Sequence, residues 1–174
     1  MINKTQVVET AFGEALYPHL SVPDTQFNAE GIYQVKLKMS RADADKEMKT
    51  INNIISKEIA EEHKKHPGNT KLTKKAPMPY EINQDDGSVV FKFKTKFKPK
   101  IFDHTGSNLI PDSKVVWGGS EIKVRYTPVG YNVASTGIGC TLRLVSCQVR
   151  KLVEGSVATQ GFAPVEPVLT EGKQ

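Results

Sequence analysis

The sequence predicts a mainly β fold in which a small antiparallel barrel carries one inserted helix. Several segments alternate apolar and polar residues with the period of two that is typical of strands. One early segment instead repeats apolar residues at helical spacing. Strands of this length and number, separated by turn residues, suit a closed or partly closed barrel.

The clearest strand is predicted over residues 89–100, which read V-V-F-K-F-K-T-K-F-K-P-K. Phe91, Phe93 and Phe97 share one parity, and we expect them to point into the barrel. The lysines on the other parity are expected to point outward. They include Lys92, Lys94, Lys96 and Lys98. Alternate side chains on a strand lie about 7 Å apart, which approaches the phosphate spacing of an extended nucleic-acid strand.

Three further strands are predicted over residues 32–39, 121–126 and 140–153. The first two repeat the division into an apolar and a basic face, and the third adds an arginine. The basic residues concerned are Lys36, Lys38, Lys123, Arg125 and Arg143. In the third strand the alternation shifts phase near Val145, which predicts a β-bulge.

The inserted helix is predicted over residues 41–66, approximately. Ser40 is suited to cap its first turn, and Pro67-Gly68 is suited to end it. The apolar stripe along it predicts packing against the core. Ahead of the strand at 32–39, Tyr17-Pro18 and Val22-Pro23-Asp24 predict a loop.

We expect one domain over residues 1–153 and a flexible, weakly acidic tail over residues 154–174. The chain of 174 residues has a net charge of +5. The tail has three acidic residues and one lysine, a charge of −2, so residues 1–153 carry +7. A basic body suggests a polyanionic partner. No apolar run approaches the roughly 18 residues of a membrane span, so we expect no membrane partner.

Aromatic residues accompany the basic faces, which is the combination that holds single-stranded nucleic acid. Trp117 adjoins a Gly-Gly bend, and Tyr131 is predicted in a loop flanked by proline and glycine. We expect these two rings to stack on bases. Tyr33 and Tyr126 are expected in the core.

Three segments carry a resemblance to a known family: G-I-Y-Q-V-K-L, D-G-S-V-V-F-K-F-K and G-G-S-E-I-K-V-R-Y-T-P-V-G-Y. They resemble the single-stranded DNA-binding proteins of short-tailed (podovirus-type) phages, in order from about Gly31 to Leu152. The resemblance implies a five-stranded OB-fold barrel with an inserted helix. It also implies sequence-tolerant binding of single-stranded DNA in phage DNA replication, recombination and strand annealing, without enzymatic activity or a cofactor.

The resemblance further implies a homodimer, contacts with phage replication proteins such as the polymerase and the helicase-primase, and a location in the host cytoplasm. It assigns DNA contacts to Tyr131 and to a basic residue near the N-terminus, for which Lys4 is the nearest equivalent. Two features depart from the family pattern. Glu30 stands where members can carry Arg, and residues 154–174 lack the strongly acidic character and the terminal aromatic that the family typically has.

Two other classes of protein remain as alternatives. In a metal-dependent nuclease, Asp103, His104 and Asp112 would hold the metal ion from one loop. In a phage structural or assembly protein, the basic strands would merely face solvent. The chain has no phosphate-binding glycine loop and no recognisable nucleophile motif.

Overall fold

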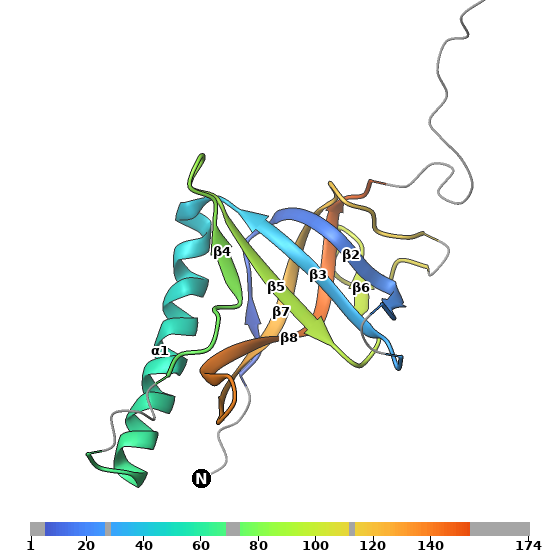
Figure 1. Cartoon of the computed structure of the whole chain (residues 1–174). Coiled ribbons are helices and arrows are strands. Elements are labelled where there is room, and N and C mark those ends of the chain that lie inside the picture. The colour runs from blue at the N-terminus through green and yellow to red at the C-terminus, as the bar shows by residue number, and fades with distance from the viewer. Residues whose placement is uncertain (1–5, 27–28, 69–73, 112–113, 154–174) are drawn as a thin grey trace, which may run out of the picture.

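The computed structural model describes residues 6–26, 29–68, 74–111 and 114–153 and has a closed five-stranded ring at its centre (Figure 1). The ring runs through β2 (Gly13–Asp24), β3 (Ile32–Met39), β5 (Val89–Thr95), β8 (Gly137–Lys151) and β7 (Glu121–Val133). It closes because β7 pairs with both β8 and β2. The junction of β5 with β8 is parallel and the other four are antiparallel. The predicted mainly β barrel with an inserted helix is therefore confirmed.

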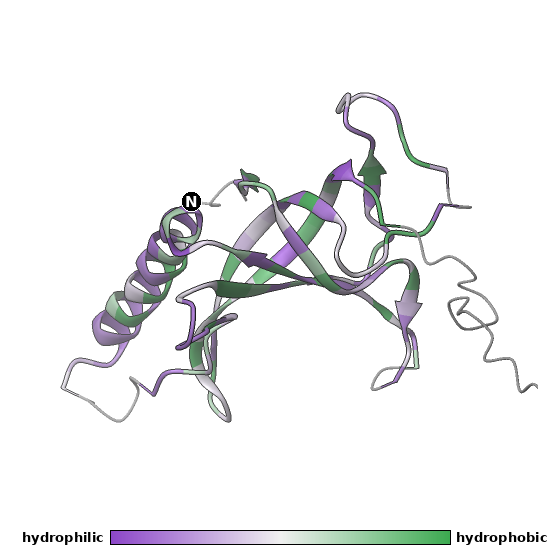
Figure 2. Ribbon diagram, turned by 90° about the horizontal axis from the view of Figure 1, so that it is seen from above, coloured by the Kyte–Doolittle hydropathy of each residue, from purple (hydrophilic) through white to green (hydrophobic). Residues whose placement is uncertain are grey.

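Three short strands and one helix complete the described part of the fold. They are β1 (Val8–Glu9), β4 (Tyr80–Ile82), β6 (Lys100–Phe102) and α1 (Arg41–Lys65). The helix is inserted between β3 and β5, and it stands beside the barrel against β7 and β8 (Figures 1 and 2). Its first turn is capped by Ser40, whose Oγ accepts a hydrogen bond from the Asp43 N–H at 3.2 Å. No helix in the described ranges is long and apolar enough to cross a membrane.

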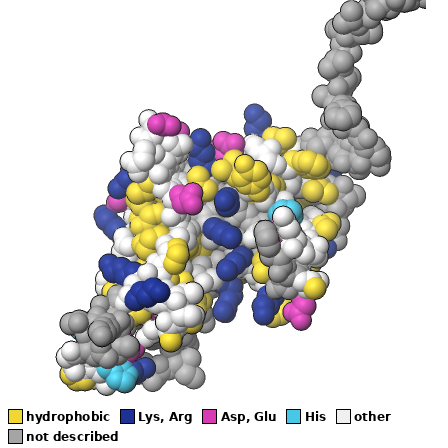
Figure 3. Space-filling view, in the orientation of Figure 1, with side chains coloured by type: hydrophobic (Ala, Val, Ile, Leu, Met, Phe, Trp, Pro, Cys, Tyr) yellow, Lys and Arg dark blue, Asp and Glu magenta, His cyan; other side chains and the backbone are white. Residues whose placement is uncertain are grey.

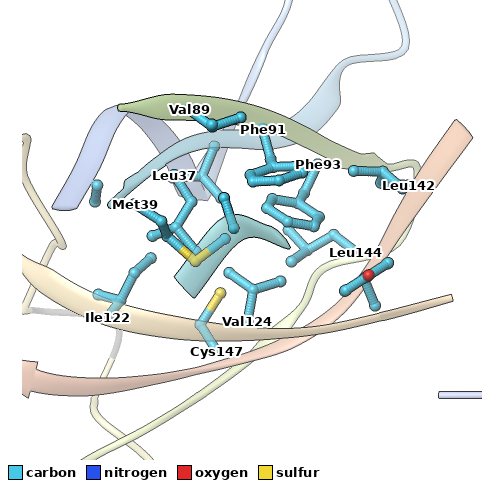
Figure 4. Packing of buried hydrophobic residues seen from close by; sticks show 14 of the residues in the cluster. Leu37, Met39, Val89, Phe91, Phe93, Ile122, Val124, Leu142, Leu144 and Cys147 are labelled. Carbon is cyan, nitrogen blue, oxygen red and sulfur yellow. The ribbon is translucent and has the colours of Figure 1, made fainter. Parts of the chain in front are cut away.

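Aromatic rings form the centre of the barrel core. Phe91, Phe93 and Tyr126 are fully buried, and the Phe93 ring lies 5.1 Å from that of Tyr126 and 6.3 Å from that of Phe91. Aliphatic side chains from β3 and β7, including Leu37 and Val124, close around them (Figure 4). Figure 2 shows hydrophobic and hydrophilic residues alternating along the strands. This alternation places one parity of each strand in the core and the other in solvent.

The loop predicted around Tyr17-Pro18 and Val22-Pro23 is wrong, because β2 runs through both pairs. The pairing of β2 with β3 is irregular, with register shifts between Leu16 and His19 and between His19 and Asp24. Proline has no backbone N–H to give to a ladder, so it is tolerated at such interruptions. The shifts therefore allow a long strand where the sequence indicates a turn.

Phe97 does not point into the barrel, and that prediction is wrong. β5 ends at Thr95, whose Oγ1 accepts a hydrogen bond from the Phe97 N–H at 3.1 Å. This local bond turns the chain and breaks the alternation, leaving Phe97 79% exposed. The bulge predicted near Val145 is confirmed, because Arg125 pairs with Ser146 while the next residue, Tyr126, pairs with Leu144.

One acidic side chain is buried between α1 and the barrel. Glu47 is 1% exposed, and its Oε1 accepts a hydrogen bond from the Tyr126 hydroxyl at 3.4 Å. Burial disfavours the charged form and raises the pKa of Glu47 above its ordinary value. Burial likewise raises the pKa of Tyr126, so its hydroxyl keeps its proton and remains a donor.

We expect Phe93→Ala and Phe97→Ala to differ sharply in stability. Phe93→Ala removes a fully buried ring and should lower the free energy of unfolding by about 3–5 kcal/mol. Phe97→Ala alters an exposed ring and should change it by less than about 0.5 kcal/mol. Urea denaturation measures both values. Equal losses would contradict the outward position of Phe97.

We expect Glu47→Gln to alter how stability depends on pH. Because the folded state raises the pKa of Glu47, it holds the proton more tightly than the unfolded chain does. The Glu47 contribution to the unfolding free energy should then fall as pH rises from about 4.5 through the raised pKa, and level off above it. Glu47→Gln should remove this fall and stabilise the protein at pH 7. Denaturation at a series of pH values, with Glu61→Gln on α1 as the exposed control, measures the effect.

Candidate nucleic-acid interface

A cluster of cations covers the outer surface of β3, β5 and β8. We call this cluster the lysine face and define it as Lys36, Lys92, Lys94 and Arg143. In the strand register, Lys36 lies directly opposite Lys92, and Lys94 lies opposite Arg143. Like charges in such positions repel each other. Figure 3 shows Lys and Arg side chains gathered over the middle of the face that β3 and β5 form.

No acidic side chain among the described residues forms an ion pair with a member of the lysine face. Lys92, Lys94 and Arg143 are also exposed. Among the described groups, the repulsion between these cations is therefore screened by solvent ions alone. A bound polyanion would reduce it further. The row follows from the alternation of β5, which buries Phe91 and Phe93 and turns the lysines between and after them outward.

The other predicted lysines lie around this face. Lys38 stands next to it on β3 and is paired with Asp86, with Nζ 3.7 Å from Oδ2. Hydrogen bonds from Ser88, with a smaller contribution from Lys38, lower the pKa of Asp86 and keep it charged. Lys96 and Lys98 are exposed in the turn after β5. Lys4 lies outside the described residues.

Lys123 and Arg125 lie on a separate surface, because β7 is separated from β3 and β5 around the ring by β2 on one side and β8 on the other. Both bind Glu9 of β1, with Lys123 Nζ 2.6 Å from Oε1 and Arg125 Nε 3.0 Å from Oε2. Hydrogen bonds from Lys123 and then Arg125 lower the pKa of Glu9. The structure thus pairs both cations with a carboxylate of the same chain. Their contact with DNA remains a prediction.

The two predicted stacking residues have different surroundings. Trp117 is 40% exposed and lines an apolar groove of about 690 Å³ between β2 and the loop before β7. The loop predicted around Tyr131 is wrong, because β7 continues through it and pairs Tyr131 with Gly139 of β8. Tyr131 is half-buried and lies close against Gly139, since a Cβ built on that glycine would lie 2.5 Å from the Tyr131 hydroxyl. Gly139 precedes Arg143 by four residues on β8, so Tyr131 lies beyond the end of the lysine face.

Tyr17 is an exposed aromatic residue that the sequence interpretation missed. It is 75% exposed on β2, and the Lys36 ammonium lies 5.9 Å from the centre of its ring. It lines the apolar groove on one side and a polar cleft of about 330 Å³ on the other. A Tyr-Pro pair is typical of a turn, so no sequence pattern distinguishes this ring from that of an ordinary loop residue.

The carboxylates considered for a nuclease do not assemble into a metal site in the described part of the chain. No group of three His, Cys, Asp or Glu side chains there is arranged to hold a metal ion. Asp103 Oδ1 instead accepts hydrogen bonds from the Thr105 hydroxyl and from the Thr105 N–H. Asp112 lies outside the described residues.

Comparison with known proteins shows which proteins this chain resembles in sequence and in fold. The chain is 29% identical to the single-stranded DNA-binding protein of Enterobacteria phage T3, over 91% of this chain and 79% of that protein. Its fold matches the crystal structure of gp2.5, a single-stranded DNA-binding protein encoded by bacteriophage T7, with a TM-score of 0.73 and 24% identity. That match covers 91% of this chain and 98% of gp2.5. The predicted resemblance to podovirus-type single-stranded DNA-binding proteins is confirmed.

The structure of a third phage protein is also similar in fold. The single-stranded DNA-binding protein of bacteriophage Enc34, in a structure with single-stranded DNA, matches with a TM-score of 0.60 and 18% identity. The match covers 85% of this chain and 88% of the Enc34 chain. No family model matches the sequence. The podovirus-type resemblance therefore comes from one curated relative and from the fold.

We expect Lys92→Ala/Lys94→Ala to weaken binding to a single-stranded oligonucleotide by roughly 5- to 30-fold, at about 0.5–1 kcal/mol per exposed ion pair. The melting temperature should hold or rise slightly, because two mutually repelling charges are removed. Fluorescence anisotropy of a labelled oligonucleotide measures the affinity. Lys57→Ala/Lys65→Ala, which removes two exposed charges from α1, is the control. An equal loss in the control would show that net charge, not the lysine face, governs binding.

Proposed function

We propose that this protein binds single-stranded DNA with little preference for sequence and acts in phage DNA replication, recombination and strand annealing. The observation that carries the proposal is the lysine face, a row of cations on a closed barrel that has no acidic partner among the described residues. The likeness to the T3 protein in sequence, and to the T7 and Enc34 proteins in fold, supports it.

The physical basis of the binding is electrostatic. Exposed lysines contact phosphates, which every nucleotide carries, and they read no base edges. Condensed counterions are released from the strand when the phosphates are neutralised, and this release favours the complex. A surface of this kind therefore gives affinity without sequence discrimination.

The proposal extends to the protein's setting. The chain forms a homodimer, contacts replication proteins such as the phage polymerase and helicase-primase, and works in the host cytoplasm during infection. It has no enzymatic activity and needs no cofactor. Incubation of labelled single-stranded DNA with Mg²⁺ or Mn²⁺ tests the absence of nuclease activity, and sedimentation velocity tests the dimer.

We expect binding to weaken steeply as salt increases. If the lysine face contacts roughly four phosphates, log affinity should fall against log salt concentration with a slope of about −3, at about 0.7 per contact for single strands. Lys92→Ala/Lys94→Ala should reduce the steepness of that slope by about 1.4. Titrations with an oligonucleotide at several NaCl concentrations measure both slopes. A wild-type slope near zero would rule out an electrostatic interface.

A further inference from the structure

Tyr17 has a backbone conformation that its own sequence disfavours. Its φ is 48°, and it is the one residue other than glycine with positive φ in the described ranges. Left-handed backbone crowds a side chain that has a Cβ, and the proline that follows, Pro18, further favours an extended conformation. The first register shift in the pairing of β2 with β3 lies at this point, between Leu16 and His19.

The strained backbone does not serve to bury the ring. Tyr17 is 75% exposed, so core packing offsets little of the free-energy cost of its positive φ. Strained residues of this kind persist where the surrounding structure holds them for a function. The conformation holds the Tyr17 ring at the boundary between the polar cleft and the apolar groove, and the ring lines both.

The two hollows differ in chemistry. The polar cleft is lined by Lys36 and Lys92 of the lysine face. Among its described lining residues the one acid is Asp24. The Asp24 carboxylate already accepts hydrogen bonds from the Gln34 side chain at 2.8 Å and the Gln26 N–H at 2.9 Å. The apolar groove presents exposed hydrophobic side chains. Those of Val22, Val115 and Trp117 are 68%, 39% and 40% exposed.

We propose that the apolar groove is a base-binding site. The phosphates of a single strand lie in the polar cleft against Lys36 and Lys92, while unstacked bases pass over Tyr17 toward Trp117. The Lys36 ammonium, 5.9 Å from the Tyr17 ring centre, is placed to hold the phosphate of the nucleotide whose base meets that ring. This inference rests on the proposed function and adds to it the path of the bases.

The charge pattern favours this occupant over a protein partner. A ligand that fills both hollows is anionic along one edge and apolar and flat along the other, as an unpaired nucleic-acid strand is. Base stacking on aromatic rings tolerates any sequence, because every base has a π-face. A duplex keeps its bases paired inside, so it can reach the cleft but cannot fill the groove. The groove thereby provides a physical basis for preferring single strands.

Tyr17→Gly removes the ring and also relieves the backbone strain, so the loss of the ring can be tested without a loss of stability. Glycine adopts positive φ at little cost, so the melting temperature of this variant should equal or exceed that of the wild type. Its affinity for an oligothymidylate should fall roughly 5- to 150-fold, the loss expected when one base loses its stacking partner. Tyr17→Phe keeps the ring and should bind as the wild type does. Val133→Ala, an exposed apolar residue on the β7–β8 hairpin, is the matched control and should also bind normally.

An oligonucleotide of the same length with abasic sites in place of its bases identifies what Tyr17 contacts. It should bind Tyr17→Gly and the wild type about equally. It should also leave the fluorescence of Trp117 unchanged, whereas the oligothymidylate should change it.

Equal loss of affinity on both oligonucleotides would overturn the base site, as would full affinity of Tyr17→Gly for the oligothymidylate. A shift of Tyr17→Gly from dimer to monomer in sedimentation would make the groove a protein interface and also overturn it. Failure of the wild type to bind either oligonucleotide would instead reject the proposed function itself.

Discussion

The proposed binding surface depends on the burial of Phe91 and Phe93 inside the closed ring of strands. Both rings are fully buried, and they hold β5 in one orientation. A slip of one residue would turn every side chain of the strand to the opposite face. Core packing therefore does more than stabilise the barrel, because it also sets Lys92 and Lys94 outward next to Lys36 and Arg143. The fold tolerates a cluster of mutually repelling cations there because the free energy gained by burying the core exceeds the cost of the repulsion.

The placement of carboxylates distinguishes this cluster from the other basic strand. Glu9 on β1 lies against Lys123 and Arg125. Phe12 adds to the same surface, since the Lys123 ammonium lies 5.1 Å and the Arg150 guanidinium 4.2 Å from its ring. These cations are thus satisfied by the fold itself. Because the lysine face has no such partners among the described residues, we expect two strands with similar sequence patterns to differ in their capacity to bind a polyanion.

The irregular course of β2 contributes what regular strands cannot. A ladder without interruption would have paired the residues around Tyr17 with β3 and kept their side chains in strict alternation. The register shifts instead release this segment and place Tyr17 between a basic cleft and an apolar groove. The surface that we propose for both phosphates and bases therefore combines a regular sheet with a local break in another strand.

The sequence by itself determined the features that depend on local periodicity. These are the strand of alternating Phe and Lys residues, the helix capped by Ser40, and the bulge at Val145. Turns and register depended on tertiary contacts, and there the sequence misled: Phe97 faces solvent because the Thr95 hydroxyl turns the chain, and β2 continues through its prolines. Only the tertiary structure decided which cations meet acids and which aromatic residues stay exposed. Those outcomes depend on residues far apart in the chain, such as Glu9 with Lys123 and Tyr17 with Trp117. The periodicity of a single segment cannot predict contacts of this kind.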